Sequence, residues 1–357
     1  PQLPRSISVV GAKRRSRISA LRIAHLTPAD RVPKSLSCSL RINLGSGMPD
    51  SESPPSPQLL FDTINAYQRT GAIKAAIELA IFTHIGDSSL SAEAIADRCL
   101  CPERGVRILC DNLAIFGFLK KSDASYSLTQ DAAVFLNENS PAYLGGVLPF
   151  LLNPAICGAF DDLAATIRSG RVHTSEHGTT APDHPVWVDF AEAMAPMMAP
   201  IAKGAAEMVK LDPERDTKII DISASHGMFG ISFAERNPRA HLVALDWEPV
   251  LAVTRRNASD SGIADRFSTI TGDAFTTDLG SDYDLALVPN FLHHFNFADC
   301  VRFLKRLQAA LRPGGKVVII EFVPNEDRIS PAASAGFSLV MLGSTPEGDA
   351  YTQSEYH

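Results

Sequence analysis

The sequence has few cysteines and no long hydrophobic run. Its 357 residues include six cysteines, two of which, Cys99 and Cys101, are separated by a single residue. This spacing matches neither a zinc site nor a disulfide framework, so we expect no metal and reduced thiols, as in the cytoplasm. A membrane helix needs roughly 20 consecutive apolar residues, and no run approaches that length. These absences predict a soluble, cytoplasmic protein.

Positive charge is scarce outside the first 47 residues. The whole chain has 33 Lys and Arg against 40 Asp and Glu, and residues 1–47 contain nine of these bases and one of the acids. The remainder therefore has 24 bases and 39 acids, a net charge of −15. Such an acidic body argues against a nucleic-acid partner. With 45% apolar residues, the chain is long enough for two globular domains.

Residues 1–56 form a basic leader that we expect to be disordered and outside the fold. Its first part, "PQLPRSISVVGAKRRSRISALRIAHL", is rich in Arg and Ser and nearly free of acids, as organelle transit peptides are. The alternative is upstream or added sequence that contributes nothing to folding, because Met48 opens "MPDSESPPSP", a Pro- and Ser-rich start typical of disordered termini. We favour the second interpretation.

Residues 57–140 have apolar residues at helical spacing, followed by a hairpin pattern. The segments "LLFDTINAYQ", "AIKAAIELAIF", "SAEAIADRC" with Ser91 as N-cap, and "PERGVRILCDNLAIFGFL" predict helices, and "FLKKSDASYSLT" predicts two strands around a turn. This order predicts a winged helix. The expected recognition helix offers only Arg104 and Arg107 to phosphates, so we predict a role in dimerisation rather than in DNA binding.

Residues 141–205 are predicted to be a helical connector. They contain His173, Glu176 and His177 in the order H-x-x-E-H, which formally matches a zinc-protease motif. That motif requires a helix, and the glycines, threonines and prolines around it predict a loop, so we interpret the match as a coincidence.

Residues 206–357 alternate between short apolar strands and amphipathic helices. The strands are "KIIDIS", "HLVALDW", "FSTITGDAF", "YDLALVPN" and "KVVIIEFV", and each of the first four is followed by a helix or loop that leads to the next. This alternation predicts a doubly wound, Rossmann-like α/β domain with a parallel sheet. Ligands in such domains bind beyond the carboxyl ends of the strands.

The loop after the first strand, "DISASHG", is a candidate cofactor site. Its small residues let the backbone approach a ligand closely, although a serine in the left-handed conformation is strained where glycine is not. The loop is therefore expected to be usable only if the backbone angles at Ser223 and Ser225 are ordinary. Asp246 ends the second strand and can accept hydrogen bonds from both ribose hydroxyls, and Asp273 after the third strand can meet an adenine amino group. Each aspartate alone is equally consistent with a turn or helix cap.

The segments "IIDISASHGMFGISFAERNP", "HLVALDWEPV", "TGDAF", "FLHHF" and "LRPGGKVVIIEFV" resemble, in order and spacing, the motifs of S-adenosylmethionine-dependent small-molecule O-methyltransferases, such as the caffeic acid, hydroxyindole and polyketide enzymes. The resemblance covers residues 58–357 and includes the family's N-terminal dimerisation domain. It implies S-adenosylmethionine as cofactor, held at Asp221, Ser223, Ser225, Gly227, Asp246, Trp247, Asp273, Ala274, Phe275 and Asn290. Two positions, Ser223 and Ser225, are usually glycine in the family, and Pro289 replaces a lysine of plant members.

Two adjacent histidines follow the fourth strand. A histidine is a suitable base for deprotonating a hydroxyl. The resemblance selects His293 as this base and Glu321, at the end of the fifth strand, as the acid that orients it, with His294 in the substrate pocket where the family has an acid. Without the resemblance, the favoured interpretation is that His293 is a helix-start histidine bonded to backbone and that Glu321 is a solvated strand end. The family's second acid falls near Ala350 and is missing, although Asp349 is adjacent.

The helix "DFAEAMAPMMAP" is a candidate substrate wall. Methionines pack adaptably against flat aromatic ligands, and the resemblance places pocket residues here. We expect Phe190, Met194, Met197 and Met198 to line the pocket, with ordinary core packing as the equal alternative for the methionines. The resemblance also implies a further helix and hairpin beyond "YTQSEYH", which we expect to lie inside a helix, so the domain is expected to be truncated.

Together these patterns predict a homodimeric O-methyltransferase that methylates a hydroxyl of a small aromatic or polyketide-like metabolite. Two alternatives stay open. The same scaffold can support S-adenosylmethionine-dependent hydroxylation or decarboxylation, because a fold does not fix its chemistry. The altered loop and the missing second acid also allow a non-catalytic binding or regulatory protein.

Overall fold

The computed structural model describes residues 7–11, 19–21 and 55–357. The chain divides into two compact units, and the boundary falls between Leu148 and Pro149. The first unit contains the predicted dimerisation domain. The second contains residues 149–205 of the predicted connector, the α/β domain and the two described segments of the leader.

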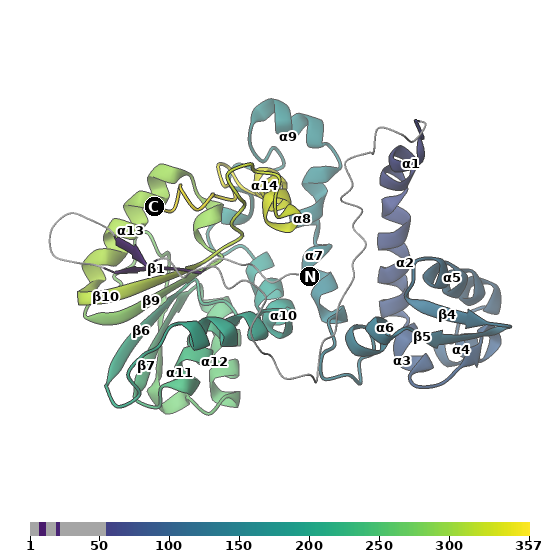
Figure 1. Cartoon of the computed structure of the whole chain (residues 1–357), viewed down its shortest axis with the longest axis horizontal. Coiled ribbons are helices and arrows are strands. Elements are labelled where there is room, and N and C mark those ends of the chain that lie inside the picture. The colour runs from purple at the N-terminus through teal and green to yellow at the C-terminus, as the bar shows by residue number, and fades with distance from the viewer. Residues whose placement is uncertain (1–6, 12–18, 22–54) are drawn as a thin grey trace, which may run out of the picture. The chain divides into compact units, whose positions relative to one another are not determined.

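The first unit is mostly helical and carries a small antiparallel sheet (Figure 1). Its elements are α1 (Gln58–Ile64), α2 (Ala66–Glu78), α3 (Ile81–Ile85), β3 (Leu90–Ser91), α4 (Ala92–Cys99), α5 (Glu103–Ile115), β4 (Leu119–Ser122), β5 (Ser125–Leu128), α6 (Gln130–Phe135) and η1 (Gly145–Val147). The predicted cap is present, because Ala94 N–H donates to Ser91 Oγ at 3.2 Å. Buried Phe82, Ile95, Leu113 and Tyr126 form the centre of its core.

Helix α1 has an exposed apolar surface. Leu59 is 79% exposed and no residue of α1 is buried. Leu60, Phe61, Ile64 and, at the start of α2, Tyr67 continue this surface. An apolar surface of this kind is unusual for a protein that stays monomeric.

The second unit begins with helices that lead into the α/β domain. These are α7 (Leu148–Leu151), α8 (Pro154–Cys157), η2 (Gly158–Phe160), α9 (Leu163–Ser169), η3 (Gly178–Thr180) and α10 (Val186–Met208). The segment from His173 to His177 lies in a loop between α9 and η3, as predicted, and His173 Nδ1 lies 2.7 Å from Thr166 Oγ1. Among the described residues, no group of three or more His, Cys, Asp or Glu side chains is placed to hold a metal ion.

A seven-stranded sheet forms the centre of the second unit. Its order is β2-β1-β10-β9-β6-β7-β8, and the strands β6 (Thr217–Ile222), β7 (Ala240–Asp246), β8 (Phe267–Thr271), β9 (Tyr283–Pro289) and β10 (Leu311–Ile320) are all parallel. Because β6 lies between β7 and β9, the chain reverses direction across the sheet after β8, which creates the crevice in which such folds bind ligands.

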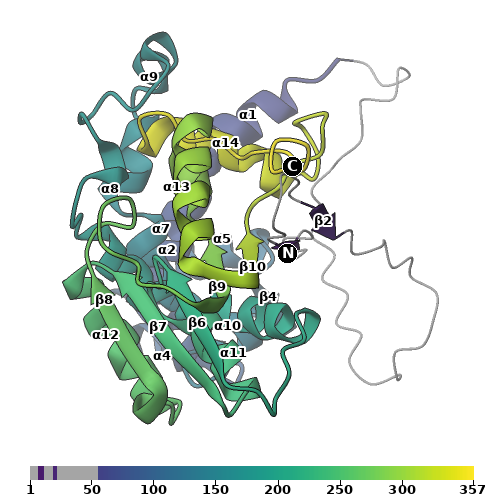
Figure 2. The ribbon, with the colours of Figure 1, turned by 90° about the vertical axis from the view of Figure 1, so that its left-hand side faces the viewer.

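Helices cover both faces of the parallel strands (Figures 1 and 2). Helices α11 (Met228–Arg236) and α12 (Glu248–Asp260) pack on β6, β7 and β8, and α10 packs on both of them. Helix α13 (Phe297–Ala310) covers the other face, where Phe303 and Leu307 are fully buried. The five predicted strands of this domain and the helices predicted between them are therefore present. None of the described helices combines the length and the apolar character of a membrane span.

The structure differs from the sequence-based expectation at both ends of this unit. Leader segments β1 (Ile7–Gly11) and β2 (Ser19–Leu21) add an antiparallel hairpin to the free edge of β10, so these two segments pair with the fold. The rest of the leader lies outside the described residues. At the other end, α14 (Ala332–Ser344) is followed by a turn at residues 353–356, where a helix was expected.

Candidate active site

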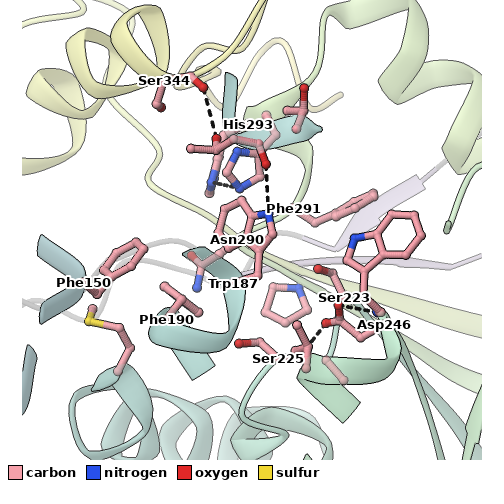
Figure 3. A pocket seen from close by; sticks show the side chains of 18 of the residues that line it. Phe150, Trp187, Phe190, Ser223, Ser225, Asp246, Asn290, Phe291, His293 and Ser344 are labelled. Atoms are coloured by element: carbon pink, nitrogen blue, oxygen red, sulfur yellow. Dashed lines mark hydrogen bonds between the residues drawn. The ribbon is translucent and has the colours of Figure 1, made fainter. Parts of the chain in front are cut away.

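A largely apolar pocket lies at the carboxyl ends of β6, β7, β9 and β10. Its volume is 570 Å³. The loop after β6 forms one end and the segment after β9 forms the other, so Ser223, Ser225 and Asp246 lie opposite His293 in Figure 3. Aromatic and methionine side chains form much of the wall, including Phe150, Trp187, Phe190, Met194, Met197, Met198, Phe229, Phe322, Phe337 and Met341.

The loop after β6 has a left-handed backbone at both serines. The φ angles are 51° at Ser223 and 54° at Ser225, so the condition of ordinary angles there is not met. The turn is held by Ala224 N–H, which donates to Leu245 O at 3.0 Å, and by Thr254 Oγ1–H, which donates to Ser225 O at 2.5 Å. These bonds to β7 and α12 hold the serines in a conformation that costs roughly 1–2 kcal/mol for each side chain.

Gly227 completes this loop and begins α11. Its φ is 76°, and a Cβ there would lie 2.7 Å from Thr254 Cγ2. Glycine is required at this position, because a side chain would be strained and would collide with α12.

Asp246 is buried at the end of β7 and faces the loop. Its Oδ2 accepts Ser225 N–H and its Oδ1 accepts Trp247 N–H, each at 2.8 Å. Burial raises its pKa to about 6, and the two backbone bonds oppose that rise. Since a carboxylate oxygen can accept two hydrogen bonds, both oxygens keep capacity for ligand hydroxyls.

Asp221 is fully buried behind the loop. Its Oδ2 accepts Gly230 N–H at 2.9 Å, and its Oδ1 has no hydrogen-bond partner in the described part of the chain. Burial raises its pKa well above the usual value. Asp221 and Gly227 shape the loop from behind, and neither is among the residues that line the pocket.

The other predicted cofactor residues line the pocket. These are Ser223, Ser225, Asp246, Trp247, Asp273, Ala274, Phe275 and Asn290. Asp273 Oδ1 accepts Phe275 N–H at 2.8 Å, which orients the turn after β8. The ring of Phe275 packs against Phe295 at a centroid distance of 4.7 Å. Asn290 also has a left-handed backbone, with φ 50°.

At the other end of the pocket, both carboxylate oxygens of Glu321 accept hydrogen bonds. Its Oε1 accepts Phe291 N–H at 2.9 Å and Leu292 N–H at 2.8 Å, and its Oε2 is bonded to His293 Nδ1. Glu321 is 1% exposed and His293 3% exposed. The structure thus brings together the two residues that the sequence analysis paired, and the carboxylate fixes the proton of His293 on Nδ1.

His294 lies beside this pair. Its Nε2 is 3.1 Å from His293 Nε2, and its ring makes a T-shaped contact with Trp187 at 5.1 Å. Burial and the neighbouring His293 lower its pKa well below the usual value. Asp349, the residue next to the missing second acid, instead lies 3.3 Å from Arg328.

The predicted substrate wall on α10 is present. Phe190, Met194, Met197 and Met198 all line the pocket, and Met194 and Met198 are also buried in the core, so the two interpretations of the methionines are both partly correct. The sequence analysis missed Phe322 and Phe337, which stack at 4.1 Å. Phe322 directly follows Glu321, and this position next to a predicted site residue could have indicated that it lines the pocket.

His226 is a further residue that the sequence analysis missed. Its ring stacks on Phe190 at 5.8 Å, and its Nδ1 accepts Met228 N–H at 3.1 Å. Its Nε2 is therefore the protonated nitrogen, and it is buried without a partner within the described ranges. Burial lowers its pKa to about 4, so the ring is neutral. In the sequence, the position of His226 within the loop after β6 was the only indication that it belongs to the site.

Comparisons with known proteins agree with this geometry. The O-methyltransferase domain family matches residues 160–357, and the O-methyltransferase dimerisation domain family matches residues 61–138. A crystal structure of a Nostoc punctiforme protein assigned as an O-methyltransferase is 50% identical, with a TM-score of 0.83, over 85% of this chain and 91% of that one.

More distant relatives have named substrates. The 3-hydroxy-5-methyl-1-naphthoate 3-O-methyltransferase of Streptomyces sahachiroi is 27% identical over 87% of this chain and 90% of its own length. Human N-acetylserotonin methyltransferase, solved in complex with S-adenosylmethionine, shares the fold with a TM-score of 0.73 at 21% identity, over 86% of this chain and 91% of its own. The chain belongs to the family of S-adenosylmethionine-dependent O-methyltransferases.

Proposed function

We propose that the protein transfers a methyl group from S-adenosylmethionine to a hydroxyl of a small aromatic or polyketide-like metabolite, with His293 as the base. The observation that carries this proposal is the His293–Glu321 pair at one end of an apolar pocket that has the Asp246 loop at its other end. The substrate hydroxyl would therefore meet a proton acceptor at one end of the pocket, while S-adenosylmethionine would lie at the loop at the other end.

The residues of the loop end fit S-adenosylmethionine. Asp246 has free acceptor capacity for ribose hydroxyls, and Phe275 offers an apolar face beside Asp273. Ser225 Oγ and His226 Nε2 are buried polar atoms without partners in the described part of the chain, as expected where a polar ligand supplies the missing bonds. The cofactor, when bound, supplies a methyl group activated by the sulfonium.

The chain's own contribution is to position and deprotonate the hydroxyl. Glu321 orients His293 and stabilises the positive charge that forms on its ring when it takes the proton. Phe337 packs against the His293 ring at 4.9 Å, and together with Phe322 it excludes water from this end.

The walls favour an uncharged, flat substrate. No Lys or Arg is among the described residues that line the pocket, so a substrate carboxylate would be buried without a counter-charge. Phe150, Phe190 and Met194 instead present apolar surface, which suits an aromatic ring. The names of the naphthoate and acetylserotonin enzymes support an aromatic ring in the substrate, but not its lack of charge, because naphthoate is a carboxylate.

We further propose that the protein is a cytoplasmic homodimer. The exposed apolar surface of α1 is expected to be buried against a partner, and the matching dimerisation family supports a second copy of the chain as that partner. The helices and the β4–β5 hairpin of this unit have the order of a winged helix. Cys99, Cys101, Cys110, Cys157 and Cys300 are free thiols, as in a reducing compartment.

The test is a mass measurement on products. The purified chain is incubated with S-adenosylmethionine and a panel of neutral phenols and naphthols, and we expect a product heavier by one CH₂. His293→Gln should abolish turnover while calorimetry shows unchanged S-adenosylhomocysteine binding. A product that has gained oxygen or lost CO₂ would favour the alternative chemistries. Failure of the folded chain to bind S-adenosylhomocysteine would favour a non-catalytic protein.

A further inference from the structure

His293 has no free ring nitrogen in the structure. Its Nδ1 is bonded to Glu321, and its Nε2 lies 3.1 Å from Nε2 of His294. The carboxylate can only accept, so Nδ1 of His293 carries a proton and Nε2 of the neutral ring is an acceptor. The single proton between the two rings therefore belongs to Nε2 of His294. A substrate hydroxyl that approaches His293 finds its lone pair already occupied.

The open nitrogen of the pair is Nδ1 of His294. It is unprotonated in this arrangement, it is buried, and it has no hydrogen-bond partner among the residues that the structure describes. His294 lines the pocket, and its ring is held by Trp187, whose indole N–H donates to Thr179 O at 2.9 Å. A buried acceptor without a donor is unfavourable, and a ligand hydroxyl can supply the missing hydrogen bond.

We propose that His294 is a second catalytic residue, which takes the proton of the substrate hydroxyl on Nδ1 and passes the proton on its Nε2 to His293. This inference rests on the proposed function. In the step, the O–H bond breaks and an N–H bond forms at His294 Nδ1, while the Nε2–H bond of His294 breaks and one forms at His293 Nε2. Bound S-adenosylmethionine would supply the methyl group, whose bond to sulfur would break as its bond to the oxygen forms, leaving S-adenosylhomocysteine. The proton ends on His293, where Glu321 neutralises it.

The surroundings favour this direction of transfer. Burial and the neighbouring His293 lower the pKa of His294, which disfavours a positive charge on its ring. His293 has the adjacent carboxylate that His294 lacks. Cys300 and Tyr356 are two other titratable groups that interact with Glu321. Burial raises the pKa of both side chains, to about 12 for Cys300. Neither competes for the proton.

Two substitutions separate proton transfer from positioning. His294→Phe keeps a ring of similar size and removes both nitrogens. His294→Asn keeps an N–H that can donate to His293 but has no group that can carry a proton between two sites. We expect both variants to lose roughly 100-fold or more in kcat on a phenol that the wild type methylates, with unchanged binding of S-adenosylhomocysteine. Near-normal kcat in either variant overturns the proposal.

The second measurement needs no turnover. Nitrogen-15 spectra of the histidine-labelled full chain report which ring nitrogen carries the proton, and we expect His294 to be protonated on Nε2 and His293 on Nδ1. A proton on Nδ1 of His294 overturns the proposal even if the variants do not fold. Absence of methyl transfer by the wild type would refute the proposed function as a whole, whereas transfer that persists without His294 refutes this assignment alone.

Discussion

At one end of the pocket Glu321 accepts three N–H groups, and Nδ1 of the neighbouring His294 is the unpaired atom there, whereas at the other end both Ser225 Oγ and His226 Nε2 have no partner in the described residues. The backbone differs in the same way. Within the short 3₁₀ helix η5 (Leu292–His294) no residue has a left-handed backbone, although Asn290 just before it does, whereas the loop has two serines in that conformation.

This difference indicates how the two ends work. The orientation of His293 is fixed before any ligand arrives, which is what a base needs to act without reorganisation. The loop instead holds strain and unpaired polar atoms that a bound ligand can relieve. The same pocket therefore combines a rigid catalytic end with a binding end whose full stability depends on its ligand.

The largest effect is expected from removing the charge of Glu321. In Glu321→Gln the amide can present its oxygen to His293 or to the N–H groups of Phe291 and Leu292, but its NH₂ then faces a donor on the other side. His293 loses its fixed tautomer, and we expect kcat to fall roughly 10³-fold or more. Steady-state kinetics measures kcat, which reports on the base end, and calorimetry measures the binding of S-adenosylhomocysteine, which reports on the loop end.

Glu326→Gln is the matched control, because Glu326 is exposed and lies outside the pocket lining. It should leave kcat unchanged. If Glu321→Gln weakens cofactor binding as strongly as it lowers kcat, the two ends are not independent and the contrast between them is incorrect.

A smaller effect is expected at Asp246. The Asp246→Ala variant loses an acceptor for ribose hydroxyls, and hydrogen bonds to a charged group contribute about 1.5–3 kcal/mol, so S-adenosylhomocysteine should bind roughly 10- to 100-fold more weakly. Because its pKa is about 6, the carboxylate takes up a proton as the pH falls below 6, and wild-type affinity should decrease there. Calorimetry between pH 5 and pH 8 checks both statements.

Asp246→Asn gives the control for the pH dependence. It keeps the shape of the side chain but cannot ionise, so its affinity should be low and should not change across that pH range. An affinity that still decreases below pH 6 in Asp246→Asn would assign the titration to another group.

The base end was largely predictable from the sequence and the loop end was not. His293 and Glu321 follow neighbouring parallel strands, whose carboxyl ends meet at one edge of the sheet, so the fold class predicts that they lie close together, and the resemblance to the family selects them as the base and its partner. The left-handed angles of Ser223 and Ser225 run against the local preference of serine, and they arise from tertiary bonds to Leu245, Asp246 and Thr254. Local sequence does not contain that information.

Two further features depend on three-dimensional packing. The hydrogen bond between His293 and His294 requires both side-chain orientations, whereas the sequence shows only that two histidines are adjacent. The stacking of His226 on Phe190 joins the loop to α10, and residues that are 36 positions apart in the chain share no local pattern.

The smallest effect is expected from relieving the strain in the loop. Ser225→Gly removes a left-handed cost of roughly 1–2 kcal/mol and an unpaired hydroxyl, while the extra freedom of glycine in the unfolded chain costs about 0.5–1 kcal/mol. We therefore expect a net stabilisation of about 0.5–1 kcal/mol, measured by urea denaturation. The control Ser259→Gly, at an exposed position of α12, should instead destabilise by about 0.5 kcal/mol.

Cofactor affinity of the same variant decides what the strain is for. If Ser225→Gly is more stable but binds S-adenosylhomocysteine more weakly, the hydroxyl contacts the ligand, and the loop sacrifices stability for binding, as its contrast with the base end indicates. If the variant gains stability and binds equally well or more tightly, Ser225 contributes only strain, and the unpaired atoms of this end do not serve binding. A loss of stability would show that the bonds of the loop to Asp246 and Thr254 already make the left-handed serine unstrained.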